Sequence, residues 1–250
     1  MMISMAPRNA LVVAVFACCM FVFAMPRAHA LAFAPTEAEW LAWPDYCRAR
    51  YVESGAGQDS KFRNSVSPAV VAQQRARVGA EAWYWLHHYC AALSYMSRAA
   101  ATQDELRAER LLRDAELNAM GQYQRMGKDN FLFPEVMVTI AQIHWQRGDA
   151  NRAHSFLEEA MQAQPTAASP YAYAATLYRQ SGEPAKAIAV LLRGDAAVNG
   201  QSAELHYFLG HAYIDVDELD AAVNHAKRAY DLGYPLPGLA VKLRRLGRTL

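Results

Sequence analysis

The chain has 250 residues, 53% of them hydrophobic, with 25 basic and 24 acidic side chains and a formal net charge of +1. Residues 1–30 contain two arginines and no acidic side chain, so the remaining 220 residues carry 23 basic and 24 acidic side chains, a net charge of −1. A chain this evenly charged lacks the basic surface that a phosphate backbone requires, which excludes nucleic acid as the expected partner. Its length is sufficient for one sizeable domain or one repeat solenoid.

The first thirty residues have the pattern of a secretory signal peptide. Arg8 supplies a positive start, residues 11–25 form an apolar run, and a small-x-small cleavage site ends at Ala30. The apolar run of about 15 residues is shorter than the ~20 needed to cross a bilayer comfortably. We therefore expect cleavage near Ala30 and a periplasmic or secreted protein. A retained N-terminal anchor and lipidation at Cys18 or Cys19 are the alternatives.

Two cysteines lie outside this segment, Cys47 and Cys90, which are 43 residues apart. An even pair in an exported protein favours a disulfide, because oxidising compartments preserve such bonds. Closing a loop of this length would stabilise the fold by about 4 kcal/mol in the chain-entropy description. Two buried free thiols are the alternative.

Residues 31–79 are expected to form a helical N-terminal extension. The apolar pattern indicates helices over 36–53, interrupted at Pro44, and over 68–78. The segment 54–67 between them is rich in Ser and Gly, and it is expected to be a mobile loop.

A longer helical hairpin is expected over residues 80–133. Its first helix extends from Glu81 to about Ala100, and its second from Thr102 to about Met126. The segment is longer than the repeats that follow it, so we interpret it as a divergent repeat-like hairpin.

Small residues return at a fixed interval in the C-terminal half of the chain. Gly148 recurs as Gly182, 34 residues later, in turns between expected helices. Three further columns repeat with an interval of 34 and then 35 residues: Ala141, Ala175 and Gly210; Ala153, Ala187 and Ala222; and Ala160, Gly194 and Ala229. Two helices that meet through small side chains across a glycine turn form a helical hairpin. One hairpin cannot bury its apolar side alone, so the pattern predicts a stack of them.

These columns resemble the tetratricopeptide repeat family. The first unit carries the family's pattern at Met137, Ile140, Ala141, His144, Ala153, Leu157, Ala160 and Pro165. The resemblance implies three repeats, 134–167, 168–202 and 203–235, in an all-α, right-handed α-solenoid of helical hairpins. Gly194 departs from the pattern, as does Asn199 where the family usually has proline, and both suggest a loosened end of the second helix.

Residues 236–250 are expected to form a C-terminal capping helix. Leu239, Leu243, Leu246 and Leu250 follow helical spacing, with lysine and arginine between them. A solenoid needs an end helix with a polar outer side. The alternative is a basic amphipathic helix that lies on an anionic membrane, which leaves membrane association open.

The sequence offers no constellation of catalytic or cofactor-binding residues. It contains no phosphate-binding loop, no nucleophile elbow, no His-Glu-x-x-His and no Cys-x-x-Cys-His haem motif. His87 and Cys90 share a helix face while His88 is expected to point elsewhere, and a zinc site requires four ligands. We therefore expect no enzyme, no cofactor and no metal. A periplasmic protein that binds a small ligand or a metal through the His87–Cys90 region is the alternative.

In the family, the first helices of successive repeats line a groove that binds a partner. The corresponding positions are Val138, Gln142, Trp145, Ala172, Thr176, Arg179, Tyr207, His211 and Ile214, with Tyr84 and His88 from the divergent hairpin. Arg179 is the only permanent cation among them, so a groove that grips a terminal carboxylate is not expected. Trp145 and Tyr207 are expected to anchor an apolar or extended segment, and packing between repeats is the alternative role of Trp145. An exposed His211 would add pH sensitivity near neutrality.

The predicted function is therefore a non-enzymatic scaffold that binds a protein or peptide segment in the bacterial cell envelope. Exported proteins of this family occur in secretion, pilus and polysaccharide-export assemblies, and this setting rests on the resemblance alone.

Overall fold

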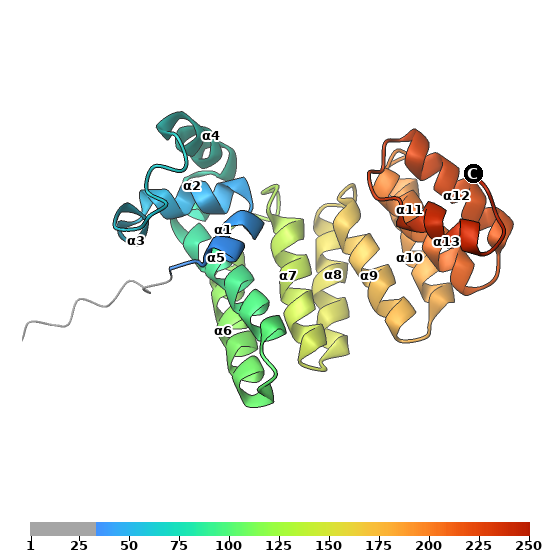
Figure 1. Cartoon of the computed structure of the whole chain (residues 1–250), viewed down its shortest axis with the longest axis horizontal. Coiled ribbons are helices and arrows are strands. Elements are labelled where there is room, and N and C mark those ends of the chain that lie inside the picture. Colours follow the sequence, from blue (N-terminus) through green and yellow to red (C-terminus); the bar gives the residue numbers. More distant parts are fainter. Residues whose placement is uncertain (1–33) are drawn as a thin grey trace, which may run out of the picture. The chain divides into compact units, whose positions relative to one another are not determined.

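A computed structural model describes residues 34–250, and these residues form thirteen α-helices and no β-strand. The predicted all-α class is thereby confirmed. The expected signal peptide, its cleavage near Ala30 and the lipidation alternatives at Cys18 and Cys19 lie outside the described residues. The helices, shown in Figure 1, are α1 (Glu37–Ala42), α2 (Asp45–Glu53), α3 (Gly55–Gln58), α4 (Pro68–Val78), α5 (Ala80–Ala101), α6 (Glu105–Tyr123), α7 (Phe133–Gln146), α8 (Ala150–Ala163), α9 (Ala168–Gln180), α10 (Pro184–Ala197), α11 (Ala203–Asp215), α12 (Leu219–Asp231) and α13 (Gly238–Arg245).

The segment around α1 to α4 is held by an aromatic core. α1 begins at a capping box, in which the Thr36 hydroxyl accepts a hydrogen bond from the backbone N–H of Glu39 at 3.2 Å. Trp40 of α1 stacks on Phe62 with the ring centroids 4.3 Å apart. The expected loop over 54–67 is wrong at α3, residues 55–58, whereas residues 59–67 form turns and bends, and Phe62 among them is buried.

A disulfide between Cys47 and Cys90 joins α2 to α5, with the two Cα atoms 5.5 Å apart. Both cysteines are buried, so the predicted bridge lies inside the core. A charged contact ties α1 to α5 further along the chain: the guanidinium of Arg98 donates to both carboxylate oxygens of Glu39, at 2.6 and 2.9 Å. Pro44 separates α1 from α2, as predicted.

The long helices α5 and α6 pack against each other and connect the N-terminal part to the repeats. The hydroxyl groups of Tyr89 on α5 and Thr139 on α7 are 3.0 Å apart and share a hydrogen bond. At the end of α7, the guanidinium of Arg147 pairs with two carboxylates of α6, those of Glu116 and of Glu109, the latter at 3.1 Å. α6 and α7 are therefore joined by charge as well as by packing.

Helices α7 to α12 form three successive hairpins, α7–α8, α9–α10 and α11–α12 (Figure 1). The first helix of one hairpin also packs against the first helix of the next. The alanines of the repeat columns lie in these contacts, since Ala141, Ala153, Ala160, Ala175, Ala187, Ala222 and Ala229 are all 0% exposed. Gly148 and Gly182 follow the first helices with φ of +80° and +74°, which glycine adopts without a Cβ clash. Asp217 takes the same role in the third hairpin with φ of +60°.

Gly194 is explained by a neighbouring side chain. A Cβ at this position would lie 2.6 Å from Cγ of Tyr171, so the absence of a side chain makes room for the tyrosine ring. α10 continues through Gly194 to Ala197, and the chain then turns at Asn199 with φ of +53°. The expected loosening of this helix at Gly194 is therefore wrong: the glycine is buried in a tight contact.

Helix α13 covers the end of the last hairpin. Leu239 and Leu243 are 0% exposed, and α13 packs against both α11 and α12. Gly210 on α11 gives Leu239 its space, because a Cβ there would lie 2.4 Å from Cδ2 of the leucine. The expected helix over 236–250 is wrong beyond Arg245, where α13 ends, and Leu246 and Leu250 after it are 45% and 46% exposed, so only part of the expected apolar side is buried inside the protein. Within residues 34–250, no helix combines the length and apolarity that crossing a bilayer requires.

Candidate functional site

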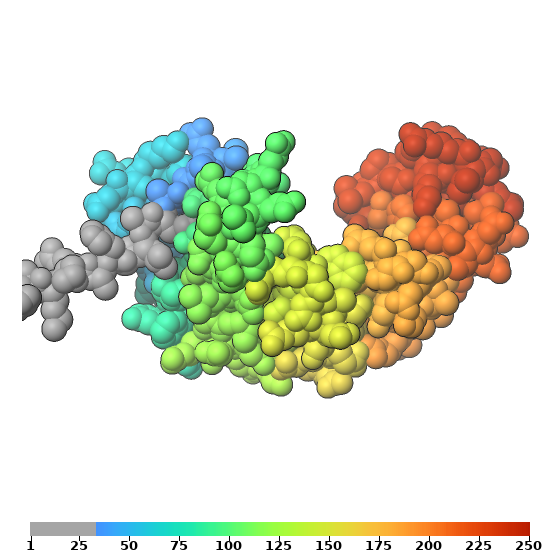
Figure 2. All heavy atoms as spheres, turned by 90° about the horizontal axis from the view of Figure 1, so that it is seen from below, coloured from blue at the N-terminus to red at the C-terminus, as the bar shows by residue number. Residues whose placement is uncertain are grey.

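Seven of the expected groove residues lie half-buried on the first helices of the three hairpins, and one of them, Ile214, packs against the cluster that contains Tyr207 and Leu239. Because α7, α9 and α11 pack against one another in this order, the side chains that they leave accessible form one surface. We call this surface the first-helix face and define it by Val138, Gln142, Trp145, Thr176, Arg179 and His211. Figure 2 shows the spheres of successive hairpins, yellow to orange, packed side by side without interruption.

Trp145 lies near the end of α7 and has a dual environment. One part of its indole packs against the hydrophobic cluster that α7 shares with α9, as does Val138, and the remainder is accessible. On α9, the Thr176 hydroxyl donates to the carbonyl of Ala172 at 2.9 Å, which leaves its oxygen lone pairs accessible as acceptors. The centre of the first-helix face is thus one large aromatic ring next to uncharged polar groups.

Arg179, the cation of the first-helix face, is neutralised by a carboxylate that the expected groove residues did not include. The Arg179 guanidinium forms an ion pair with Asp215 at the end of α11, and Lys242 of α13 approaches the same carboxylate at 3.3 Å. Burial acts to raise the pKa of Asp215, but hydrogen bonds and charge from Arg179 and Lys242 outweigh it and hold the pKa below its usual value. Arg179 is therefore not the isolated cation that the sequence suggested.

The imidazole of His211 was expected to be exposed and to have a pKa near neutrality, and it has neither property. It is half-buried, and burial together with the charges of Arg179 and Lys242 lowers its pKa to about 4, with Asp215 opposing the shift. The side chain is therefore uncharged from pH 5.5 to 8. The expectation that His211 confers pH sensitivity near neutrality is wrong.

Tyr207 is covered by the C-terminal segment. Its ring stacks on Tyr234 with centroids 4.1 Å apart, and it packs in a cluster with Leu239 of α13. It is 9% exposed, so the capping segment occupies the place where a partner would meet it. Ala172 is likewise buried, at 3% exposure, and for these reasons neither residue belongs to the first-helix face.

A furrow of about 620 Å³ lies over the second helices of the hairpins and not on the first-helix face. It is bordered by α8 and α10, with Ala174 and Tyr178 of α9 contributing to its lining. Its cations already have partners: Lys186 pairs with Glu183, and Arg193 with Glu158 at 2.7 Å. Because these charges are satisfied, the furrow offers no evident anchor for a charged ligand.

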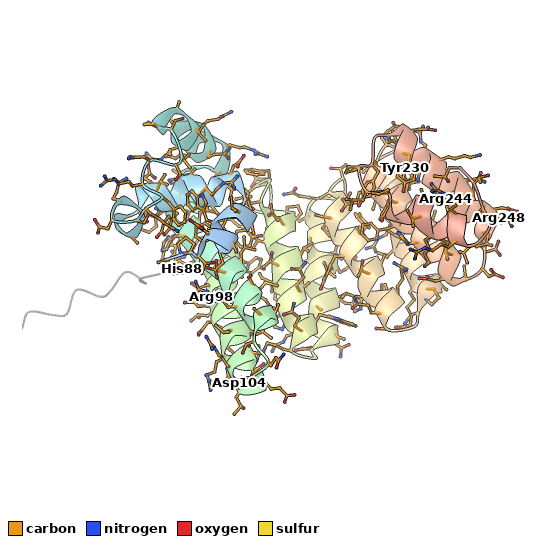
Figure 3. All side chains as sticks on the ribbon, in the orientation of Figure 1. His88, Arg98, Asp104, Tyr230, Arg244 and Arg248 are labelled. Carbon is orange, nitrogen blue, oxygen red and sulfur yellow. A yellow bond between two sulfur atoms is a disulfide. The ribbon has the colours of Figure 1, made fainter. Side chains whose placement is uncertain are left out.

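The His87–Cys90 region does not form a metal site in the part of the chain that the structure describes. The Cys90 sulfur is bonded to Cys47 and is no longer a thiolate. His88, labelled in Figure 3, lies beside His87 with ring centroids 4.2 Å apart, so the expectation that the two rings point apart is wrong. Nδ1 of His88 is 2.8 Å from the amide oxygen of Asn118, a contact in which the imidazole donates. Burial, and then His88 and Arg50, lower the pKa of His87 to about 4.

Across residues 34–250, no group of three or more His, Cys, Asp or Glu side chains is arranged to hold a metal ion. The residues that sequence reasoning missed are Asp215 and Lys242. Asp215 follows Arg179 by 36 residues, close to one repeat, so an opposite charge at this interval was a usable signal. Lys242 belongs to a helix outside the repeat register, and the sequence contains no sign of its position.

The geometry of successive hairpins agrees with profiles of known families. Two tetratricopeptide repeat profiles match the chain, one over residues 144–202 and one over residues 203–232. Residues 144–232 are tetratricopeptide repeats. The predicted family is thereby confirmed, and the matched residues cover α8 to α12 with the last part of α7.

A curated relative of the chain is the cellulose synthase operon protein C of Komagataeibacter sucrofermentans. It is 32% identical over 145 residues, which is 54% of this chain and 10% of that protein. The chain therefore spans about a tenth of the length of the curated relative that it matches.

Solved structures of MamA are also similar to the tetratricopeptide repeat chain. One MamA crystal structure is 17% identical with a TM-score of 0.40, covering 58% of this chain and 88% of that one. MamA from Desulfovibrio magneticus RS-1 is 18% identical with a TM-score of 0.41, covering 68% and 85%. These values are too low to carry functional information.

Proposed function

We propose that this chain is a non-enzymatic scaffold that holds an extended segment of a partner protein on the first-helix face. The observation that carries the proposal is the accessible part of Trp145, flanked by uncharged polar groups and presented by helices of a repeat family suited to protein interaction. Large aromatic rings at the centre of a surface dominate interface energies. Because Arg179 is paired with Asp215, the face fits a segment that offers an apolar side chain to Trp145 and backbone groups to Gln142 and Thr176.

We further propose that the scaffold works outside the cytoplasm, in the cell envelope. The buried Cys47–Cys90 disulfide supports this, because such bonds persist in oxidising compartments. The signal-peptide pattern of residues 1–30 supports export independently. The relative is named for a cellulose synthase operon, which favours a polysaccharide-export assembly over a secretion or pilus system as the setting.

The first experiment locates the partner on the surface. A photo-crosslinking amino acid is placed at Gln142 or Thr176 of the full chain, and at Leu192 on α10 as the matched control, since Leu192 is also accessible at 42% exposure. We expect the same adduct from positions 142 and 176 and none from position 192. Adducts from position 192 alone, or from no position, would contradict the proposal.

The second experiment measures the contribution of Trp145 with the partner that crosslinks. Trp145→Ala is expected to weaken binding by roughly 2 kcal/mol or more, about 30-fold. Tyr178→Ala is the control, because this half-buried ring stacks on His154 in the furrow over the second helices, at a centroid distance of 4.4 Å. If Trp145 serves packing alone, both variants will lower the melting temperature and neither will change the affinity.

A further inference from the structure

Two histidines of the third hairpin face each other at hydrogen-bond distance. Nδ1 of His206 on α11 and Nδ1 of His225 on α12 are 3.0 Å apart, and the ring centroids are 5.2 Å apart. His206 is 5% exposed and His225 is half-buried, so water is largely kept from the contact. Neither residue belongs to the first-helix face.

The surroundings of this pair come from the second hairpin as well as the third. Nε2 of His206 is 3.2 Å from the carbonyl oxygen of Gly200, which follows α10, and 3.6 Å from the carboxylate of Asp195 on α10. The Tyr213 ring lies nearly parallel to that of His225, with centroids 5.3 Å apart. Arg228 of α12 is the nearby cation, and it donates to the same Gly200 carbonyl at 3.3 Å.

These contacts fix the protons on the two rings. A carbonyl oxygen accepts and cannot donate, so the Gly200 contact requires a hydrogen on Nε2 of His206. The neutral His206 ring then has a lone pair on Nδ1, and His225 must donate from its own Nδ1. Two neutral rings therefore satisfy each other in one arrangement of tautomers.

Protons added in acid change this arrangement in two stages. The first proton can bind Nδ1 of His206, which then donates to Nδ1 of His225 once His225 has moved its own proton to Nε2. The positive charge then lies on the His206 ring, which faces the Asp195 carboxylate. A buried oxygen of Asp195 has no hydrogen-bond partner in the neutral arrangement, so it is available for that role. A second proton leaves no lone pair between two cationic rings whose nitrogens are 3.0 Å apart, and the rings must separate.

We propose that His206, His225 and Asp195 form an acid-sensitive joint that holds the α11–α12 hairpin against α10 near neutral pH and loosens it when both imidazoles are charged. The joint connects three helices, so separation of the rings acts on the packing between the second and third hairpins. α11 also carries Asp215, the partner of Arg179, and loosening would therefore reach the first-helix face. The joint itself does not depend on what that face binds.

The pKa of His225 is shifted in the direction that makes the folded joint less stable in acid. Burial, and then the charge of His206, lower the pKa of His225 below its usual 6.5, with Asp195 opposing the shift. A lowered pKa in the folded state means that protonation favours unfolding. The stabilisation from neutral His225 is complete above pH 6.5 and is lost as the pH falls through its folded pKa.

Hydrogen exchange of the full mature chain between pH 7.5 and 4.5, corrected for intrinsic exchange rates, tests the joint. We expect protection of residues 203–231 to fall at a higher pH than protection of 105–123, a helix that contains no histidine. His225→Gln keeps a donor to His206 but cannot become charged, so it should lower the midpoint of that loss by about half a pH unit or more. Asp195→Asn removes the counter-charge and should raise the midpoint.

Lys227→Gln is the matched control on α12, since Lys227 lies two residues after His225 but is exposed. It should leave the midpoint for residues 203–231 unchanged. An unchanged midpoint in His225→Gln, or a loss of protection that is uniform along the chain, would overturn the proposal. Urea unfolding at pH 7.5 verifies that each variant is folded before the acid titration begins.

Discussion

Replacing Gly194 by alanine is expected to destabilise this protein, although alanine is the better helix former. In the interior of a helix the substitution contributes about 1 kcal/mol of stability through propensity alone. At this site the new Cβ would lie 2.6 Å from Cγ and 2.9 Å from Cδ1 of Tyr171, where ordinary carbon contacts are about 3.5–4.0 Å. Tyr171 is 3% exposed, so its ring has no free space to move into.

The size of the effect follows from these two opposing contributions. Overpacking a filled core costs about 1–3 kcal/mol, and contact through Cγ lies toward the upper end because Cγ moves only if χ1 leaves its rotamer or the backbone shifts. The net loss should be about 1–2 kcal/mol after the gain in propensity. In a Tyr171→Ala background the ring is gone, and the same substitution should stabilise by about 1 kcal/mol.

The assay is urea unfolding of the four proteins of this double-mutant cycle, followed by circular dichroism at 222 nm (roughly the helical minimum). Gly121→Ala in α6 is the control, because a Cβ there would meet only Cγ of His88, at 3.9 Å, and should stabilise the helix. If Gly194→Ala stabilises the protein as much as Gly121→Ala does, the account of the Tyr171 contact is refuted.

Three further outcomes are expected. The double substitution Cys47→Ala/Cys90→Ala should lower the free energy of unfolding by about 4 kcal/mol, because the bridge closes a loop with a sequence separation of 43 residues. A loss below about 1 kcal/mol in urea titrations would contradict the entropic role of the bridge. Gly210→Ala should displace Leu239, since the new Cβ would lie 2.4 Å from Cδ2 of the leucine. Limited proteolysis should then cut the α13 segment faster. An unchanged cleavage rate would show that the leucine adapts. His211→Gln should leave the pH dependence of partner affinity unaltered from pH 5.5 to 8, because a pKa of about 4 keeps the imidazole neutral in this range. The contribution of neutral His211 to fold stability is complete above pH 6.5 and is lost as the pH falls toward 4. A change in that pH dependence between pH 5.5 and 8 would refute the burial argument.

The repeat architecture could be predicted because it depends on backbone geometry and on residue size, both of which are written in the sequence. Ala141 and Ala153 mark where two helices approach, and Gly148 marks a turn that needs a left-handed backbone. The pairing of Cys47 with Cys90 was accessible for a similar reason, since only two cysteines lie outside the expected signal peptide.

The composition of the binding surface was less accessible, because it depends on side chains that meet across different hairpins. Asp215 neutralises Arg179, and the capping segment brings Tyr234 onto Tyr207. Such contacts are decided by rotamers and by the packing of α13, which lies outside the repeat period. The same reason applies to Gly194, whose meaning depends on the ring of Tyr171 from the preceding helix.

Comparison of hydrogen exchange in the free protein and in its complex with the crosslinked partner tests the proposed function most directly. The scaffold account predicts slower exchange over the first helices α7 and α9 on binding, 133–146 and 168–180, with little change over α8 and α10, 150–163 and 184–197. Protection centred on α8 and α10, with the first helices unaffected, would contradict it.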